Sequence, residues 1–318
     1  MQSVRRAVID IGTNSVKLLV ADVNGRVVQA IIEESKQTRL GQGFYETRRL
    51  QAPTIAATAK AVAEFADAAR SKEAKSIRVF ATSAARDAVN QDDLTHEIQR
   101  ISGLRVDVIT GDTEADWVFQ GVTTDPSLRA MPLLILDVGG GSTEFIIGEG
   151  DEIRFRSSFP IGSVRLLDKF PPADPPKPAE LDQVRQWVRD FLTKDVRPQL
   201  GPALARESAA GEHKGDLQLV GTGGTASILG RMEANLETYD RERLEQTRLS
   251  LVRLRWHLHH LWSLSLEQRR EIIGLPKNRA DIILMGVALY EGIMTEFGFN
   301  ELRISTRGLR FAAVMQTV

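Results

Sequence analysis

The chain has 318 residues, of which 42% are hydrophobic and 26% are charged, and its formal net charge at pH 7 is −1. This composition is typical of a soluble globular protein with room for two domains, and the near-neutral charge argues against broad nucleic-acid binding. The absence of cysteine excludes disulfides and thiolate metal sites. No apolar run is long enough for a membrane span or a signal peptide, so we expect no membrane partner and a cytoplasmic location.

The first predicted element is a β-meander over residues 4–33, in which apolar runs alternate with short polar turns. Its first turn follows Asp10 and contains Gly12, Asn14 and Ser15. Glycine lets the backbone turn sharply and approach a ligand closely. We therefore expect this turn to bind an anion.

A polar loop with several glycines follows at residues 34–45, and its Lys36 and Arg39 could face the same anion. The next segment, residues 53–74, is rich in alanine and has apolar residues at helical spacing. It is predicted to be a helix.

Two further strands each lead into a helix. Residues 77–81 form the first predicted strand, and the short helix after it carries Arg86 in its first turn. Residues 106–109 form the second, and the helix at 115–122 opens just after Glu114. A strand that ends at a helix N-terminus is a suitable anion site.

The motif at residues 133–147 is the most informative part of the chain. An apolar strand ends on Asp137, a second apolar strand begins after Glu144, and the turn between them contains Gly139, Gly140, Gly141 and Ser142. Successive N–H groups in such a turn form a concave nest for phosphate, and a neighbouring carboxylate could hold a divalent cation.

This motif repeats the N-terminal one with the same spacing. The equivalent pairs are Asp10 with Asp137, Gly12 with Gly139, and Ser15 with Ser142. Two distant copies of one hairpin predict two related half-domains, each offering a phosphate-binding turn to a shared cleft.

The second half of the chain continues this pattern. A strand at 217–220 leads through a turn that contains Gly223, Gly224 and Thr225 into another helix, which again predicts a phosphate contact. Residues 180–196 are predicted to be an amphipathic helix, and residues 201–216 a surface loop. Three histidines, His257, His259 and His260, are compatible with a zinc site, but no carboxylate lies at a ligand spacing, so we rank this alternative low.

Taken together, these motifs resemble the exopolyphosphatase and guanosine pentaphosphate phosphohydrolase family, a branch of the actin-like phosphotransferase superfamily. The segments that carry the resemblance are residues 10–15, 39–43, 81–87, 111–115, 137–144, 160–162, 221–225, 279–281 and 305–310. Their order and spacing cover nearly the whole chain and are similar to those of the short two-domain form of the family.

The resemblance implies a fold and a domain organisation. We expect an α/β protein of two actin-like (ribonuclease H-like) domains with a cleft between them. Domain I would comprise residues 1–124 and 305–318, and domain II residues 125–304. Between them, residues 123–131 form a short polar connection that contains Pro126 and is followed by Pro132.

The resemblance also implies roles for particular residues. Glu114 would be the base that activates water, and Asp10, Asp137 and Glu144 would be the oxygen ligands of Mg²⁺. The phosphate-binding residues would be Asn14, Ser15, Arg39, Arg86, Gly139, Gly140, Gly141, Ser142, Gly223, Gly224 and Thr225.

The predicted function is that of an exopolyphosphatase, which removes the terminal phosphate of inorganic polyphosphate as orthophosphate by Mg²⁺-assisted attack of water. The alternative substrate is guanosine pentaphosphate. An ATP-dependent small-molecule kinase and an actin-like structural protein rank lower. We expect no nucleic-acid partner, and a homodimer stays open.

Overall fold

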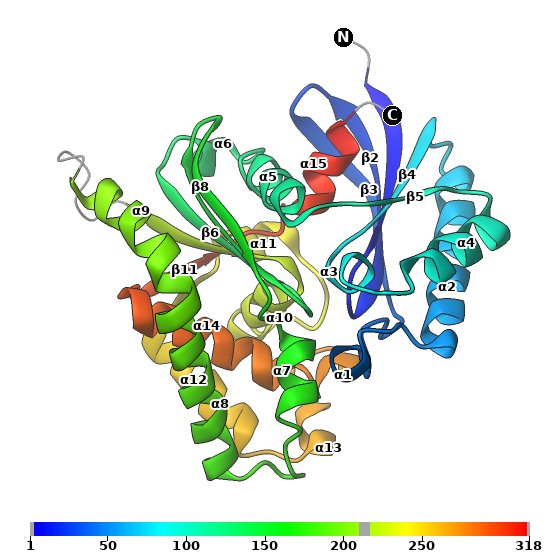
Figure 1. The fold of residues 1–318 in the computed structure, drawn as a ribbon. Helices are drawn as coiled ribbons and strands as arrows, with labels where there is room; N and C mark the ends of the chain where they lie inside the picture. Colours follow the sequence, from blue (N-terminus) through cyan, green and yellow to red (C-terminus); the bar gives the residue numbers. More distant parts are fainter. Residues whose placement is uncertain (1–2, 210–216, 317–318) are drawn as a thin grey trace. The chain divides into compact units, whose positions relative to one another are not determined.

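The computed structural model describes residues 3–209 and 217–316. The chain divides into two compact units, unit 1 with Met1–Thr124 and Arg307–Val318, and unit 2 with Asp125–Thr306. Each unit is an α/β domain built on one sheet with helices packed against it (Figure 1). The predicted fold class of two α/β domains is confirmed.

In the described part of unit 1, five strands form a sheet with the order β3-β2-β1-β4-β5. They are β1 (Val4–Ile11), β2 (Ser15–Asn24), β3 (Val27–Gln37), β4 (Ser76–Ala81) and β5 (Val106–Val108). The first three form an antiparallel meander, whereas β4 pairs with β1 in parallel and β5 with β4 in parallel. Parallel neighbours need a crossover connection, which here contains helices.

Helices cover both faces of this sheet (Figure 1). The helices of unit 1 are α1 (Phe44–Thr47), α2 (Ala52–Ser71), α3 (Ser83–Arg86), α4 (Gln91–Ser102), α5 (Gly111–Val122) and α15 (Leu309–Met315). Ala7, Ile9 and Ile11 of β1 belong to the same hydrophobic cluster as α2 and α4. Because strand residues alternate between faces, Val8 and Asp10 lie on the opposite face.

In the described part of unit 2, six strands form a sheet with the order β10-β11-β9-β6-β7-β8. They are β6 (Leu133–Val138), β7 (Thr143–Glu149), β8 (Glu152–Phe159), β9 (Gln218–Thr222), β10 (Arg248–Ser250) and β11 (Glu301–Ile304). β6, β7 and β8 form an antiparallel meander, β9 pairs with β6 in parallel, and β11 pairs with β9 in parallel. Apart from the edge strand β10, this is the strand arrangement of unit 1.

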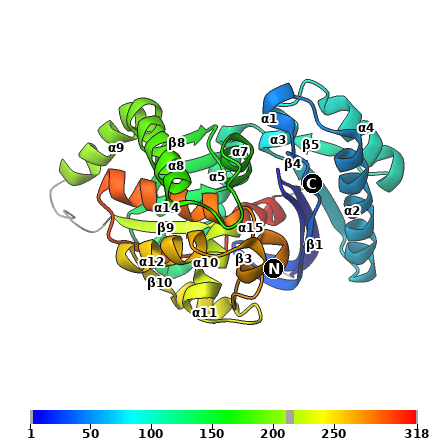
Figure 2. The same ribbon diagram turned by 90° about the horizontal axis from the view of Figure 1, so that it is seen from below.

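The core of unit 2 lies between its sheet and a layer of longer helices, α8, α12 and α14 (Figure 1, Figure 2). α14 is buried along most of its length, which fits its nearly uninterrupted apolar sequence. The longer helices are α8 (Pro178–Phe191), α9 (Arg197–Ala209), α10 (Gly223–Glu233), α12 (Leu251–Trp262) and α14 (Ile283–Phe297). The shorter ones are α6 (Pro126–Arg129), α7 (Ser163–Lys169), α11 (Arg241–Gln246), α13 (Leu266–Arg269) and the 3₁₀ turn Lys277–Arg279.

The predicted surface loop at residues 201–216 is wrong in its first part. After α8 the chain passes through a π-helical turn, Leu192–Val196, and continues as α9 up to Ala209. Leu200 and Ala203 pack into the core of unit 2, and this burial stabilises a helix that contains both Gly201 and Pro202. Residues 210–216 of the predicted loop lie outside the described residues.

Unit 1 is closed by a contact between two segments that are far apart in sequence. A Cβ built on Gly121 of α5 would lie 2.0 Å from the carbonyl oxygen of Gly308, just before α15. The obstacle is backbone, which cannot rotate away as a side chain can. α5 and α15 therefore pack at a distance that only glycine allows at residue 121.

This contact predicts a large stability difference between two helical glycines. We expect Gly121→Ala to lower the free energy of unfolding by about 1–3 kcal/mol, the usual range for overpacking. Gly201→Ala in α9 is the control, because its Cβ would meet only the Cγ of Arg197, at 3.7 Å. It should be neutral or stabilise by up to about 1 kcal/mol. Thermal unfolding followed by circular dichroism measures both, and equal melting temperatures would contradict the prediction.

Candidate active site

The two glycine turns predicted from the sequence have the same geometry. In unit 1 the N–H of Gly12 donates to the carbonyl of Ser15 over 3.0 Å, and in unit 2 the N–H of Gly139 donates to that of Ser142 over 3.0 Å. Each turn closes a four-residue loop between paired strands. The predicted internal repeat is confirmed in the backbone of both hairpins.

In unit 2, helix α7 holds the turn by its carbonyl groups. The carbonyl of Gly139 accepts from the N–H of Ser163 at 3.0 Å, and that of Gly140 accepts from the N–H groups of Val164 at 2.9 Å and Arg165 at 3.0 Å. The carbonyl of Gly141 accepts from Nε of Arg165 at 3.0 Å. All three carbonyls therefore point toward the start of α7.

This arrangement fixes the direction of the N–H groups. In a trans peptide the N–H points away from the C=O of the same peptide plane. The N–H groups of Gly140, Gly141 and Ser142 therefore point away from α7. Neighbouring N–H groups that point in one general direction form a nest suited to phosphate oxygens.

Gly162 is required for this packing. A Cβ at this position would lie 2.5 Å from both the carbonyl carbon and the oxygen of Gly140, and 2.7 Å from the nitrogen of Gly141. In the sequence, Gly162 belongs to the motif at residues 160–162, which by itself indicates no role for this glycine. Its role is to let the peptide before α7 lie directly against the glycine turn.

Two predicted metal ligands lie side by side on the sheet of unit 2. Asp137 and Glu144 are directly opposite each other in the antiparallel ladder between β6 and β7, so their side chains share one face. Glu144 is buried, and its Oε1 accepts hydrogen bonds from the hydroxyls of Ser142 at 2.9 Å and Ser158 at 2.7 Å. Like charges directly opposite each other are destabilising unless a cation or proton lies between them.

Gly223 leaves room beside Asp137. It begins α10 with φ of +80°, and a Cβ there would lie 2.1 Å from Oδ1 of Asp137. Gly224 has open space around its Cβ position, whereas the hydroxyl of Thr225 donates to the carbonyl of Val138 at 3.2 Å. Of these three residues, Gly223 is the one that lies so close to the carboxylate of Asp137 that a side chain would not fit.

Tyr290 lies beneath the same carboxylate and was missed by the sequence analysis. Its hydroxyl is buried, 3.5 Å from the carbonyl oxygens of Leu136 and Thr222. Burial, together with the negative charge of Asp137, raises the pKa of Tyr290 well above its usual value. The phenol therefore stays neutral and can act as a hydrogen-bond donor. No local pattern in the apolar sequence of α14 marks this residue.

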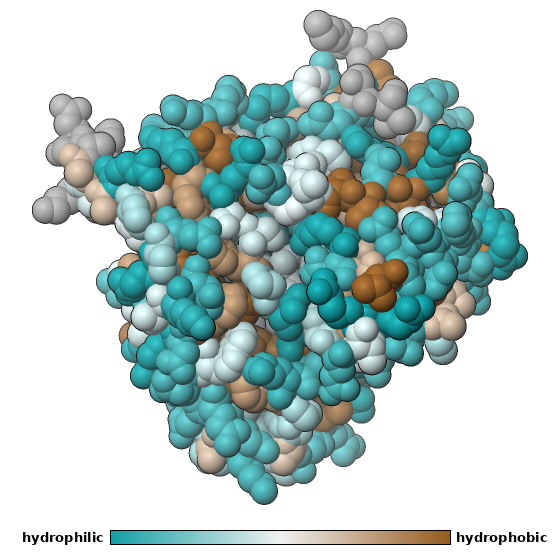
Figure 3. All heavy atoms as spheres, viewed as in Figure 1, coloured by the Kyte–Doolittle hydropathy of each residue, from teal (hydrophilic) through white to brown (hydrophobic). Residues whose placement is uncertain are grey.

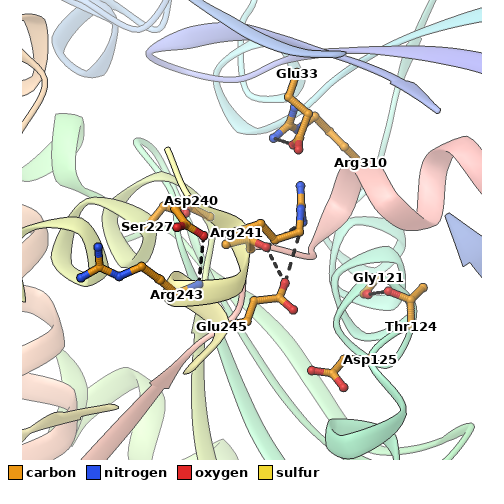
Figure 4. A network of polar contacts seen from close by, with 12 residues as sticks. Glu33, Gly121, Thr124, Asp125, Ser227, Asp240, Arg241, Arg243, Glu245 and Arg310 are labelled. Atoms are coloured by element: carbon orange, nitrogen blue, oxygen red, sulfur yellow. Dashed lines mark hydrogen bonds and ion pairs between the residues drawn. The ribbon is translucent and has the colours of Figure 1, made fainter. Parts of the chain in front are cut away.

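The matching position in unit 1 has a different charge. Asp10 lies opposite Lys17 in the ladder between β1 and β2, where unit 2 has a glutamate opposite its aspartate. Burial raises the pKa of Asp10, and the positive charges of Lys17 and Arg310 act against that rise. Arg310 of α15 is held by the carbonyl of Leu18 at 2.9 Å and by Glu33 at 3.2 Å (Figure 4). An alignment of the two hairpins would have revealed Lys17, which the sequence analysis overlooked.

This difference decides which carboxylates suit a divalent cation best. Asp137 and Glu144 form an all-oxygen pair on one sheet face, and Mg²⁺ is typically held by one or two carboxylates plus phosphates and water. Among the described residues, no group of three or more Asp, Glu, His or Cys could hold a metal ion by itself. The donor set in unit 2 therefore fits a cation that completes its coordination with substrate and water.

In unit 1, the hairpin turn is joined to the loop that follows the meander. The N–H groups of Thr38 and Arg39 donate to the carbonyl of Asn14 at 3.1 and 3.0 Å, and the N–H of Gly41 donates to that of Thr13 at 2.8 Å. Arg39 adopts a left-handed conformation with φ of 51°. The structure thus brings the predicted phosphate ligands Asn14 and Arg39 together.

Polar side chains near these loops fall into two groups: buried atoms without a hydrogen-bond partner, and a surface lysine in an ion pair. Within residues 3–209 and 217–316, three buried side-chain atoms of this region have no hydrogen-bond partner, and they are Thr13 Oγ1, Asn14 Nδ2 and Ser83 Oγ. Such atoms usually have a partner in a complete structure, so they favour a polar ligand here. Lys36, by contrast, pairs with Glu64 on the surface of unit 1.

The predicted base and a predicted phosphate ligand form an ion pair. Glu114 lies in the first turn of α5 and is only 7% exposed. Its Oε2 lies 2.9 Å from Nη1 of Arg86, whose guanidinium also donates to the carbonyl of Ile109 at 3.3 Å. An arginine has five N–H donors, so Arg86 can orient this carboxylate and still contact a phosphate.

The structure also shows how the three histidines considered as zinc ligands are placed. His257 is buried and pairs with Glu233 of α10 over 2.7 Å, and Arg253 contacts the same carboxylate. Burial lowers the pKa of His257, with the opposing effect of Glu233 second. His259 and His260 are exposed on α12. Within the described part of the chain, these histidines do not belong to a group of three or more ligand residues that could hold a metal ion.

The described helices include no candidate for a membrane span. Of the helices in residues 3–209 and 217–316, none is both long and apolar enough to cross a bilayer. On the face of the molecule drawn in Figure 3, hydrophilic residues predominate and hydrophobic ones form small separate groups.

Comparisons with known proteins agree with this geometry. The sequence profile of the Ppx/GppA phosphatase family matches residues 19–317. Exopolyphosphatase 2 of Mycobacterium tuberculosis is 31% identical over 318 aligned residues, which cover 96% of each chain. Exopolyphosphatase 1 of the same organism is 27% identical over 98% of this chain and 88% of its own length.

Solved structures with the same fold support the assignment. A crystal structure of an exopolyphosphatase from Cytophaga hutchinsonii superposes with a TM-score of 0.82 at 27% identity and covers 97% of this chain and 96% of that one. The Ppx/GppA family member of Aquifex aeolicus gives a TM-score of 0.77 at 27% identity, over 98% of this chain and 97% of that one. The chain therefore belongs to the Ppx/GppA phosphatase family, and with it to the hydrolases that act on phosphoanhydrides.

Proposed function

We propose that this protein is an exopolyphosphatase that removes the terminal phosphate of inorganic polyphosphate and releases orthophosphate. The observation that carries the proposal is the carboxylate pair of Asp137 and Glu144, beside a turn whose N–H groups point away from α7. Such a turn suits phosphate oxygens, and such a pair suits a cation bound to them. Two of the relatives named above are exopolyphosphatases.

In this proposal, water attacks the terminal phosphorus while the bond to the bridging oxygen breaks. Glu114 accepts the proton of the attacking water, and the shortened chain leaves with the bridging oxygen. Arg86 holds the carboxylate of Glu114 in a fixed direction through their 2.9 Å contact. This positioning contributes because a general base must lie within hydrogen-bond reach of the proton that it removes.

The remaining residues bind and orient the phosphates. The N–H groups of Gly140, Gly141 and Ser142 would hold phosphate oxygens from unit 2, and Asn14, Ser15 and Arg39 would do so from unit 1. Asp137 and Glu144 would hold Mg²⁺, with Asp10 as a further ligand, and a bound cation would neutralise charge that develops on the phosphate oxygens. That both turns face one shared cleft stays a prediction, as do the cytoplasmic location and the homodimer.

We favour polyphosphate over guanosine pentaphosphate as the substrate, because one aromatic candidate for stacking on a guanine base lies in the protein core. Phe44, which follows the Arg39 loop, is buried in the core of unit 1 at 2% exposure. Its neighbour Tyr45 packs against it edge-on, with ring centroids 5.1 Å apart. A phosphate chain needs only repeated anion contacts, which these loops provide.

The role of Glu114 can be tested by a conservative change. We expect Glu114→Gln to reduce turnover by a factor on the order of 10² or more, because the amide cannot accept the proton of water. Substrate binding should persist, since the base acts mainly in the transition state. The control is Asp112→Asn, which changes an exposed carboxylate two residues away in the same helix turn. Near-normal turnover of Glu114→Gln would assign the base to another residue.

The metal assignment predicts a specific change in Mg²⁺ dependence. EDTA should abolish phosphate release and added Mg²⁺ should restore it, while Asp137→Asn should raise the Mg²⁺ concentration needed for half-maximal rate about tenfold or more. Glu152→Gln removes an exposed carboxylate from β8 of the same unit and should leave this concentration unchanged. Binding of Mn²⁺ followed by electron paramagnetic resonance gives a readout without turnover. Full activity in EDTA would refute the metal assignment.

Substrate choice can be decided by one set of assays. Phosphate release should be measured side by side on short polyphosphate, long polyphosphate, guanosine pentaphosphate and ATP with Mg²⁺. We expect the highest kcat/KM on polyphosphate, with chains of modest length preferred. A clear advantage for guanosine pentaphosphate would replace the proposed substrate and leave the hydrolytic mechanism standing.

A further inference from the structure

Unit 2 contains a polar cavity, separate from the residues assigned to hydrolysis. It has a volume of about 530 Å³ and is lined by residues of α8, α12 and α14. The ribbon of these three helices can be followed in Figure 1 and Figure 2. This volume is within the range of small-molecule binding sites, roughly 300–1,000 Å³. Three arginines line it, Arg185 and Arg189 from α8 and Arg255 from α12.

A buried carboxylate at the base of the cavity holds two of these arginines. Glu291 of α14 is 7% exposed, and its Oε1 lies 3.1 Å from Nε of Arg255. Its Oε2 lies 3.4 Å from Nε of Arg185. A buried carboxylate that is paired on both oxygens fixes its partners in place, because breaking either pair would leave charge unpaired in the interior.

Both guanidinium groups keep donors for a ligand. Arg255 also donates from Nη2 to the hydroxyl of Thr295 at 3.0 Å, and Nη2 of Arg185 lies 3.4 Å from Nε2 of His259. Over residues 3–209 and 217–316, neither arginine has a hydrogen-bond partner at Nη1. Two anchored arginines therefore present N–H groups whose geometry suits phosphate oxygens.

The balance of charge around the cavity is positive. Arg185, Arg189 and Arg255 face Glu291 and one carboxylate at the rim, Asp182. The other carboxylate, Glu296, is already paired with Arg197 at 2.8 Å, outside the group that lines the cavity. Three arginines against two carboxylates that are not paired outside the cavity leave an excess of positive charge, which favours an anionic ligand.

Gly292 of α14 is among the residues that line the cavity. A Cβ on Gly292 would lie 2.6 Å from Cγ1 of Val188. α14 and α8 therefore approach closely at this residue, which itself lines the cavity.

From these observations we propose that this cavity is a second anion site, which binds a small molecule through its phosphate groups. Arg185 and Arg255 would hold the phosphate oxygens, and Arg189 at the exposed rim would contact the rest of a polyphosphorylated ligand. The shared chemistry is a phosphate chain, whether in inorganic triphosphate or in a nucleoside triphosphate. The site does not depend on the proposed hydrolytic function, because none of its residues belongs to that machinery.

The test is calorimetric titration of the full chain with ligands that resist hydrolysis. The probes are a methylene-bridged triphosphate analogue, the β,γ-methylene analogue of GTP, and orthophosphate, each at about 0.15 M salt to screen weak surface attraction. Because the proposed active site also binds phosphate chains, we expect two saturable binding events for the triphosphate analogue. Arg255→Gln should weaken one of them about tenfold, the loss of about 1.4 kcal/mol, and leave the other unchanged. Arg189→Glu should weaken the same binding event similarly, and since this side chain is exposed, the change leaves folding undisturbed.

The matched control is Arg253→Gln on the same helix, whose guanidinium pairs with Glu233 outside the cavity. It removes the same charge and should leave the affinity unchanged. Binding of the triphosphate analogue alone would identify an inorganic chain as the ligand, and equal binding of the GTP analogue would identify the phosphates as the common feature. Wild-type affinity in both cavity variants, an equal loss in the control, or no saturation at millimolar ligand would overturn the proposal.

Discussion

The like-charge pair of Asp137 and Glu144 is the constraint on which the chemistry of unit 2 depends. Two carboxylates placed opposite each other on one sheet face repel each other. The surroundings reduce this repulsion in part, because Ser142 and Ser158 donate hydroxyls to Glu144. A cation that arrives with its phosphate ligand would complete the compensation. The fold thus places two carboxylates of like charge next to the glycine turn of unit 2.

The two units carry the same hairpin with a different charge opposite its aspartate. Both turns close with the same 3.0 Å hydrogen bond and sit at the same place in equivalent sheets. In unit 1 the position opposite the aspartate is Lys17, so its charge is balanced by the protein itself. In unit 2 the equivalent position is Glu144, a second carboxylate. Duplication of the fold therefore preserved backbone geometry while a single cross-strand position changed the electrostatics.

Much of this arrangement could be predicted from sequence because it is local. The glycine turns, their repeat and the strands around them follow from the spacing of apolar, acidic and glycine residues. The pairing of Arg86 with Glu114 could not be derived in this way, since it depends on two strand ends meeting in space. Tyr290 and Gly162 were also beyond local patterns, because their roles come from what packs against them. α9 was missed because its Gly201 and Pro202 suggest a loop, whereas burial of Leu200 and Ala203 keeps the chain helical.

The cavity between α8, α12 and α14 illustrates the same limit. Its arginines lie on two helices about 70 residues apart, and the carboxylate that joins them comes from a third. On each helix alone these residues look like an ordinary charged surface. Only the packing of the helices turns them into a cluster with a buried anion at its centre.

The contact between Gly121 and Gly308 has a consequence for the order in which the chain folds. Helix α15 packs on β1, β2 and α5, and its Arg310 caps the carbonyl of Leu18. On the ribosome, the first 124 residues emerge long before helix α15 is made. Unit 2, by contrast, is continuous in sequence and can form its core as soon as residue 306 is made. The central part of the chain is thus free to fold first, and the part of the unit 1 sheet that α15 covers, on β1 and β2, stays exposed until this last helix is made.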